Sequence, residues 1–183
     1  MHNTKMINTL EKPLIEICAK EPKGIKGKLK YGCIADTSFE RDLNIKIGAR
    51  VMLIFNISVV DGLVNGSLGH VVGIEKKGEN VEFIIIDFDD HGSGSRQRAI
   101  YPGLTAKYKA QNGTPIKRYK LDYQLTSKGG KNHAAKSWVE QFPIRLAWAI
   151  TVHKIQGRHH PDQINLTSVL AALLDVFGKH FID

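Results

Sequence analysis

The sequence is poor in cysteine, has no long apolar run and holds fewer acidic than basic residues, and each shortage narrows the function classes open to it. Cys18 and Cys33 are the two cysteines in 183 residues, too few for a disulfide framework and in no Cys/His spacing typical of a metal site. No apolar stretch reaches the roughly 20 residues of a membrane span, and the first residues hold no signal-like apolar core. We therefore expect a soluble intracellular protein of one domain, or of one domain with a small insert.

A nucleotide-binding phosphate loop is also missing. Such a loop needs Gly, four residues and then Gly-Lys-Ser/Thr, so that backbone amides surround the phosphates and the hydroxyl reaches magnesium. Gly24–Lys28 and Gly129–Asn132 have neither the spacing nor the hydroxyl. His159 and His160 stand near Asp162, but adjacent side chains on an extended segment point apart, so we expect no metal site there. The chain is therefore not expected to hold a nucleotide or a metal ion by itself.

Positive charge, by contrast, is abundant. Lys and Arg number 26 against 18 Asp and Glu, a formal net charge of +8 with histidine neutral. A positive surface favours approach to phosphate backbones and to anionic membranes. The basic residues gather in two groups, Lys20, Lys23, Lys26, Lys28 and Lys30, and Lys107, Lys109, Lys117, Arg118, Lys120, Lys128, Lys131 and Lys136. Each group is either a nucleic-acid contact or a solvated face, and from composition alone the solvated face is the favoured interpretation.

Short apolar runs separated by turn residues predict a small β-barrel over residues 45–142. Ala49–Phe55 and Val81–Phe88 are near-continuous apolar runs, typical of strands buried on both faces. Asn65-Gly66 tolerates the positive φ angles of a tight turn, so we expect a hairpin or short loop there. The segment Lys76–Asn80 predicts another turn.

The hydrophobic period changes in the last third of the chain. Tyr119–Leu125 alternates apolar and polar residues, which is the pattern of a half-buried strand, and Trp138–Phe142 is the candidate return strand. Beyond Pro143 the spacing predicts a helix. One face of it is formed by Leu146, Ala149, Ile150 and His153, and Gly157 is placed to end it.

The segment Thr151–Gly157, with the sequence TVHKIQG, gathers several polar side chains of different chemistry. It offers a hydroxyl, an imidazole, an ammonium and a carboxamide before a glycine that permits close backbone approach. Such side chains are frequent donors to phosphate oxygens, which suits a phosphate–sugar track. From composition alone, a helix end with solvated polar residues is the favoured interpretation.

Preceded by LAWAI, this heptapeptide resembles motif V of the RecD-like superfamily-one DNA helicases, above all the Pif type (petite integration frequency). GARVMLIFN at Gly48–Asn56 and DGLVNGSLGHVVGI at Asp61–Ile74 resemble the segment by which that family leaves its second RecA-like domain and enters an inserted SH3-like barrel. QFPIRLAWA at Gln141–Ala149 resembles the return, and His2-Asn3 resembles a short segment before the insertion. The similarity covers residues 2–157.

The resemblance implies an α/β fold with a β-rich insert, namely a partial second RecA-like domain carrying an SH3-like small β-barrel. It places the first part of the RecA-like domain at residues 1–44, the insert at 45–142, and the return with motif V and a divergent tail at 143–183. It implies single-stranded DNA as a partner and no membrane. The implied DNA-side residues are Thr151, His153, Lys154 and Gln156, with Gly157 at the nucleotide interface. ATP and magnesium are the cofactors implied for a complete 5′-to-3′ helicase, which includes the missing amino-terminal RecA-like domain and is nuclear or mitochondrial in a eukaryote.

The match is incomplete, which leaves more than one function open. Walker A, Walker B and the first RecA-like domain have no counterpart, and Arg158–Pro161 stands where the family continues toward motif VI and its transition-state arginine. We expect a fragment or truncated gene product that is inactive as an ATPase alone. The alternatives are a non-catalytic nucleic-acid or protein-binding barrel derived from a helicase, and a product without a function of its own.

Overall fold

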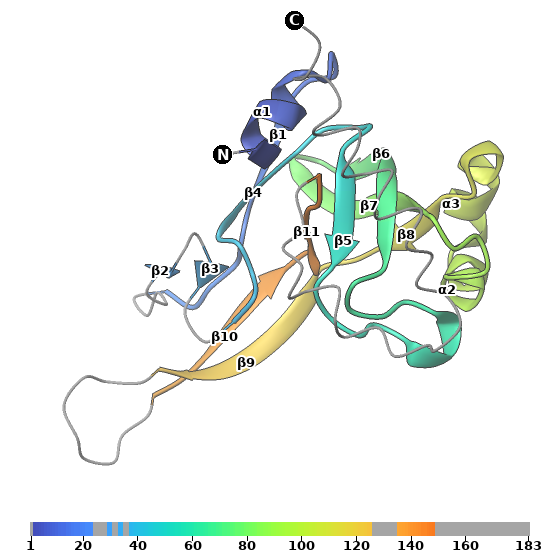
Figure 1. The fold of residues 1–183 in the computed structure, drawn as a ribbon. Coiled ribbons are helices and arrows are strands. Elements are labelled where there is room, and N and C mark those ends of the chain that lie inside the picture. Colours follow the sequence, from blue (N-terminus) through green and yellow to red (C-terminus); the bar gives the residue numbers. More distant parts are fainter. Residues whose placement is uncertain (1, 24–28, 31–32, 35–36, 126–134, 149–183) are drawn as a thin grey trace, which may run out of the picture. The chain divides into compact units, whose positions relative to one another are not determined.

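An antiparallel five-stranded sheet is the centre of the computed structural model (Figure 1). The structure describes residues 2–23, 29–30, 33–34, 37–125 and 135–148, all within one compact unit of the chain. The helical elements are α1 (His2–Asn8), η1 (Val59–Asp61), α2 (Ser95–Ile100), α3 (Pro102–Lys107) and η2 (Lys109–Gln111), of which η1 and η2 are 3₁₀ turns. The strands are β1 (Ile15–Cys18), β2 (Leu29–Lys30), β3 (Cys33–Ile34), β4 (Asp42–Ile45), β5 (Arg50–Leu53), β6 (Leu68–Lys77), β7 (Asn80–Phe88), β8 (Thr114–Ile116), β9 (Tyr119–Leu125), β10 (Ala135–Gln141) and β11 (Ile144–Leu146). None of the described helices has the length and apolar character that crossing a bilayer needs.

The main sheet has the strand order β11-β5-β6-β7-β8, and every neighbouring pair is antiparallel. Residues 51–53 of β5 are buried, and residues 84–86 of β7 are fully buried. Their side chains alternate between the two faces of the sheet, so both faces of these strands are covered. The strands predicted from the apolar runs at 49–55 and 81–88 are thus confirmed, although β5 ends at Leu53.

Two glycines shape the pairing of β6 with β7. Gly78 turns the chain at φ +60°, which confirms the turn predicted at Lys76–Asn80. Gly73 follows a register shift in β6, and a Cβ at this position would come within 2.3 Å of the Tyr108 ring. The lack of a side chain at Gly73 therefore lets the segment after α3 pack closely against the sheet.

The loops around the sheet carry η1, α2 and α3, which the sequence pattern did not predict. Asp61, 5% exposed, accepts the backbone N–H of Arg96 at Oδ1 (2.8 Å) and that of Gln97 at Oδ2 (2.9 Å). Its carboxylate satisfies the first amides of α2, because Gly94 at the N-cap position has no side-chain acceptor. The segment 89–94 therefore connects the end of β7 to the start of α2.

β9 and β10 form a separate two-stranded ribbon (Figure 1). Seven residue pairs hold it together, so the strand predicted at Tyr119–Leu125 is confirmed. The return strand begins at Ala135 rather than at Trp138. The inner face of the ribbon contributes to a second apolar cluster, formed by Ile34, Phe39, Ile54, Tyr123 and Val139.

The β1–β4 pair is joined to the ribbon by backbone and side-chain hydrogen bonds. Lys20 and Glu140 exchange backbone hydrogen bonds of 2.9 Å, which continues the line of β1 along β10. The buried amide of Gln141 donates to the carbonyl of Ile17 (2.8 Å). The amino-terminal strands are therefore fixed to the root of the ribbon.

Two predictions of architecture are not met. The described strands of residues 45–142 close no barrel, because the main sheet is open at β11 and β8 and the ribbon pairs apart from it. The helix predicted beyond Pro143 is wrong at its start, since Ile144–Leu146 is a strand whose pairing with β5 outweighs the helical spacing. The rest of that prediction, from Ala149 onward, lies outside the described residues. The described part is thus β-rich, with small sheets and few helices.

Candidate nucleic-acid interface

The residues predicted to contact DNA and nucleotide lie outside the described part of the chain. They are Thr151, His153, Lys154, Gln156 and Gly157. Their roles stay predictions. The described residues show the strand that leads to them and a basic, aromatic surface on the ribbon.

β11 leads toward the predicted residues and is held to the main sheet. Its pairing with β5 continues where the Ala147 N–H donates to the carbonyl of Arg50 (2.9 Å), and Trp148 packs against the main core. The side-chain amide of Asn3 in α1 donates to the carbonyl of Leu146 (3.2 Å). Two segments that carry the resemblance, one at each end of the described chain, therefore meet at β11.

Asn65 and Gly66 are turn residues, as predicted. The Asn65 N–H donates to Asn56 Oδ1 (2.7 Å), while Gly66 has φ +93° and donates its N–H to the carbonyl of Leu53 (2.8 Å). The connection from β5 to β6 is nevertheless longer than a hairpin turn, because η1 lies within it.

The predicted basic group of residues 107–136 contains cations in different environments. Arg118 is half-buried and donates to the carbonyls of Cys18 (3.0 Å) and Glu140 (3.3 Å). Burial lowers the pKa of Arg118 from its ordinary value. Lys107 forms an ion pair with Glu75 (2.6 Å). Arg118 therefore holds strands together, and the charge of Lys107 is already matched by a carboxylate.

The ribbon carries two exposed cations of this group, Lys120 and Lys136, on the side opposite the second apolar cluster. We call this side the outer ribbon face, and it consists of Lys120, Asp122, Gln124, Lys136, Trp138 and Glu140. The ammonium of Lys120 lies 4.9 Å from the centroid of the Trp138 ring. Both strands are predicted by the sequence pattern, but this surface is not. The alternation in each strand carried the signal, but only the pairing register shows that Lys120 and Trp138 are neighbours.

A second aromatic feature lies at the root of the ribbon. The rings of Phe39 and Phe55 stack with centroids 4.9 Å apart, and those of Phe55 and Tyr119 stack at 5.5 Å. Phe39 is fully buried, whereas Tyr119 is 40% exposed. The stack is thus anchored in the core at one end and open to a further flat group at the other.

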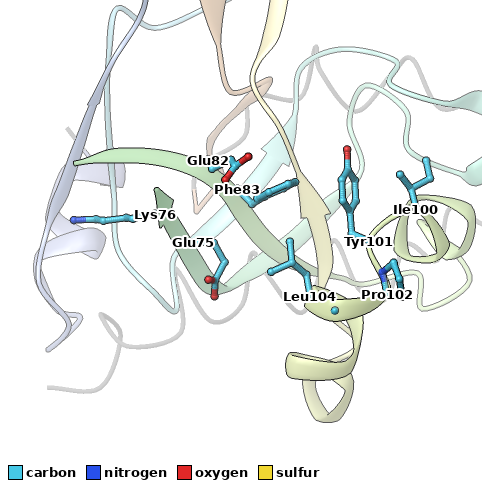
Figure 2. A pocket seen from close by; sticks show the side chains of 9 residues that line it. Glu75, Lys76, Glu82, Phe83, Ile100, Tyr101, Pro102 and Leu104 are labelled. Atoms are coloured by element: carbon cyan, nitrogen blue, oxygen red, sulfur yellow. The ribbon is translucent and has the colours of Figure 1, made fainter. Parts of the chain in front are cut away.

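A cleft of about 380 Å³ lies beside α2 and α3 (Figure 2). It is lined by Glu75, Lys76, Glu82, Phe83, Ile100, Tyr101, Pro102, Gly103 and Leu104. Hydrogen bonds from Lys107 and Tyr108 lower the pKa of Glu75, so this carboxylate is ionised at neutral pH. Lys107 matches the charge of Glu75, and Lys76 stands with Glu82 in the lining, so the cleft shows no acidic or basic excess that would identify a charged ligand.

One group of described side chains has a spacing suited to a metal ion. Glu16, Cys18 and Asp42 bring their ligand atoms within 4.8 Å of one another, and all three are exposed. Desolvation and the nearby Asp42 raise the pKa of the Cys18 thiol, which disfavours the thiolate that a metal needs. The group is therefore a poor metal ligand set.

Comparison with known proteins connects the chain to one group of enzymes. Residues 29–74 match the family model of the 2B domain of the DNA helicase Pif1. The chain is 34% identical over 115 residues to the ATP-dependent DNA helicase PIF1 of Homo sapiens, a match that covers 63% of this chain and 14% of the human protein. It is 30% identical over 162 residues to the ATP-dependent DNA helicase Pif1 of Campylobacter jejuni, covering 85% of this chain and 31% of that protein. The chain thus spans about a third or less of the curated relatives it matches.

A solved structure shares the fold. The crystal structure of the Pif1 helicase from Bacteroides in complex with ADP-AlF3 and ssDNA superposes with a TM-score of 0.54. The match covers 85% of this chain and 29% of that chain at 23% sequence identity. At this identity the likeness establishes the fold, and the arrangement of described strands therefore occurs within a larger helicase.

Proposed function

Because this chain is Pif1-like in sequence and in fold, we propose that it works as the carboxy-terminal portion of an ATP-dependent 5′-to-3′ DNA helicase. In this proposal residues 1–44 begin the second RecA-like domain, residues 45–142 form an inserted β-rich module, and residues 143–183 return to the RecA-like domain with motif V. The family-model match at 29–74 spans the junction between the first two parts.

The observation that carries the proposal is the pairing of the strands that enter and leave the insert. β5 lies near the start of the 45–142 region and β11 follows its end, and the register pairs Leu53 with Ile144 and Val51 with Leu146. A module whose ends lie side by side can be inserted into a host domain without separating the host's own segments. The bond from Asn3 to the carbonyl of Leu146 supports the same arrangement, because it brings α1 to the exit strand.

The proposed contribution of the chain is single-stranded DNA binding and coupling through motif V. Thr151, His153, Lys154 and Gln156 contact the strand, and Gly157 lies at the nucleotide interface. ATP and magnesium are bound in the complete enzyme, where an amino-terminal RecA-like domain supplies the phosphate loop. Relatives named as ATP-dependent DNA helicases and the Bacteroides complex with ADP-AlF3 and ssDNA support this assignment.

A salt titration of a fluorescent oligonucleotide tests the proposed DNA site. Lys154→Ala removes one phosphate contact, so we expect weaker binding across all sequences and a slope of log K against log salt that is smaller by about 0.7. The control is Lys76→Ala, which removes an exposed lysine on β6 in the lining of the cleft beside α2 and α3 and should leave both quantities unchanged. Equal losses in the two variants would mean that general surface charge, not motif V, holds the DNA.

The alternative function is a non-catalytic binding module derived from a helicase. It is favoured by one observation, which is that the 183 residues contain no phosphate loop while the described part has its own buried core. Adding a separately purified amino-terminal RecA-like domain of the same family distinguishes the two. DNA-stimulated ATP hydrolysis that requires both proteins supports the helicase function, whereas DNA binding without any gain in hydrolysis supports the module.

A further inference from the structure

The outer ribbon face places one indole ring between two lysines. Trp138 stands opposite Asp122 in the register, and Lys120 and Lys136 belong to the polar cross-strand pairs on either side of it. The Lys120 ammonium lies 4.9 Å from the centroid of the indole, and Lys136 is exposed. Cation, aromatic ring and cation therefore follow one another along the ribbon.

The acidic residues of this face do not cancel both cations. Glu140 stands opposite Lys120 in the register but is paired with Lys20 (3.0 Å), so this end of the face holds two cations and one acid. Neither Lys120 nor Lys136 forms an ion pair with any described residue. Asp122 lies across from the indole, so its charge disfavours a phosphate at the middle of the face and leaves the two ends favourable. The matching ligand carries negative charges at both ends and a flat, uncharged group between them.

The face is also held in place from behind. Tyr123 and Val139 alternate with the outer residues and are buried in the second apolar cluster. At the root of the ribbon, Gln141 and Arg118 donate to the carbonyls of Ile17 (2.8 Å) and Cys18 (3.0 Å). A surface fixed on paired strands is positioned before its ligand arrives, which reduces the ordering cost of binding.

We propose that the outer ribbon face binds single-stranded DNA, with one base stacked on Trp138 and the flanking phosphates at Lys120 and Lys136. Stacking and phosphate neutralisation are the two contributions by which proteins hold single strands without reading their sequence. A cation–π contact is weak at an exposed site, so the Lys120 ammonium can turn from the ring to a phosphate. Duplex DNA does not fit, because its bases are stacked on one another. The site uses other residues than Thr151–Gly157, and it rests on the proposed function only in taking the bound strand to be DNA.

Intrinsic fluorescence of the full chain tests the stacking. The chain has two tryptophans, so Trp148→Phe leaves Trp138 as the one indole emitter. Titration with oligo(dT) of about 16 nucleotides should quench this emission in a saturable manner, because a stacked base deactivates the excited indole. A blunt duplex of the same length should leave the emission unchanged.

Substitutions test the energetic contribution, with anisotropy of a labelled oligonucleotide as the readout and urea unfolding as the check that each variant folds. We expect about tenfold weaker binding for Trp138→Ala and a smaller loss for Trp138→Phe, which keeps a ring. Lys120→Ala with Lys136→Ala should reduce the salt slope by about 1.4. The matched control is Lys76→Ala with Lys77→Ala, which removes the same charge from exposed positions on β6 and should leave the slope unchanged. If Trp138→Ala does not fold, the lysine pair still decides the outcome.

The outcomes separate this proposal from the motif V site. Unchanged Trp138 emission at saturating oligo(dT), equal quenching by duplex, or an equal slope loss in the control pair overturns it. If Lys154→Ala abolishes binding while the ribbon variants leave it unchanged, the ribbon contributes nothing, and the ribbon proposal fails while the proposed function stands. If the ribbon variants abolish binding and Lys154→Ala does not, the proposed function loses its DNA site and the ribbon site stands.

Discussion

Replacing Gln141 by leucine should destabilise the protein through the loss of side-chain hydrogen bonds, of which two are short, rather than through packing. Gln141 is 1% exposed, its amide nitrogen donates to the carbonyl of Ile17 (2.8 Å), and its amide oxygen accepts the N–H of Phe142 (2.9 Å). Leucine has a similar volume, so Gln141→Leu creates little cavity but leaves a buried carbonyl and a buried N–H without these partners. The substitution therefore isolates the cost of unsatisfied polar groups at the root of the ribbon.

The magnitude follows from the number of groups left unpaired. Each buried donor or acceptor without a partner costs about 1–3 kcal/mol, and two such groups give about 3 kcal/mol after the apolar gain of leucine is set against them. This is a large share of the roughly 5–15 kcal/mol that stabilises an ordinary domain. With a urea m-value of about 2 kcal/mol/M, the unfolding midpoint should fall by about 1.5 M.

Urea unfolding of the full chain, followed by far-ultraviolet circular dichroism, measures this change. The matched control is Gln111→Leu, the same substitution at an exposed position in η2, which should move the midpoint little. A midpoint for Gln141→Leu within about 0.3 M of the parent, at an unchanged m-value, would refute the reasoning. In that case the Ile17 carbonyl and the Phe142 N–H find other partners, and the root of the ribbon is not held by this amide.

The sequence predicted those strands whose signal is local. The apolar runs of β5 and β7, the glycine turn at Gly78 and the alternation of β9 were all visible, because burial on two faces, positive φ and a half-buried face each leave a pattern within a few residues. The helix α2 was not visible, because Asp61, the carboxylate that satisfies its first amides, lies more than 30 residues away. A cap supplied from that distance leaves no mark in the segment that forms the helix.

β11 shows the opposite case, in which a local pattern misled. The spacing of apolar residues after Pro143 is helical, yet Ile144–Leu146 pairs with β5 along the edge of the main sheet. Such a short run has little intrinsic preference, so the hydrogen bonds offered by a neighbouring strand decide its state. The predicted DNA residues begin shortly after this strand, at Thr151, and stay predictions. The outer ribbon face was missed for a related reason, since only cross-strand register brings Lys120 beside Trp138.

Three further predictions concern catalysis, pH dependence and local stability. The purified chain should release phosphate from ATP only at background rate, with or without single-stranded DNA, because no phosphate loop positions the nucleotide; DNA-stimulated turnover that survives further purification contradicts this. His70 is exposed, but partial desolvation by its neighbours, then the charge of Arg50, lowers its pKa below 6.5, so the unfolded chain takes up this proton first. The free energy of unfolding should therefore fall as pH drops through that value, and His70→Gln should reduce the pH dependence of the urea midpoint between about pH 7 and pH 5. If the variant shows the same pH dependence as the parent protein, His70 is not its cause. Hydrogen exchange should be slowest in β5 and β7, whose amides lie in the interior of the main sheet between paired strands on both sides. Because a native core opens last, exchange in β7 as fast as in the two-stranded β1–β4 pair would mean that the five-stranded sheet is not the stable centre of the fold.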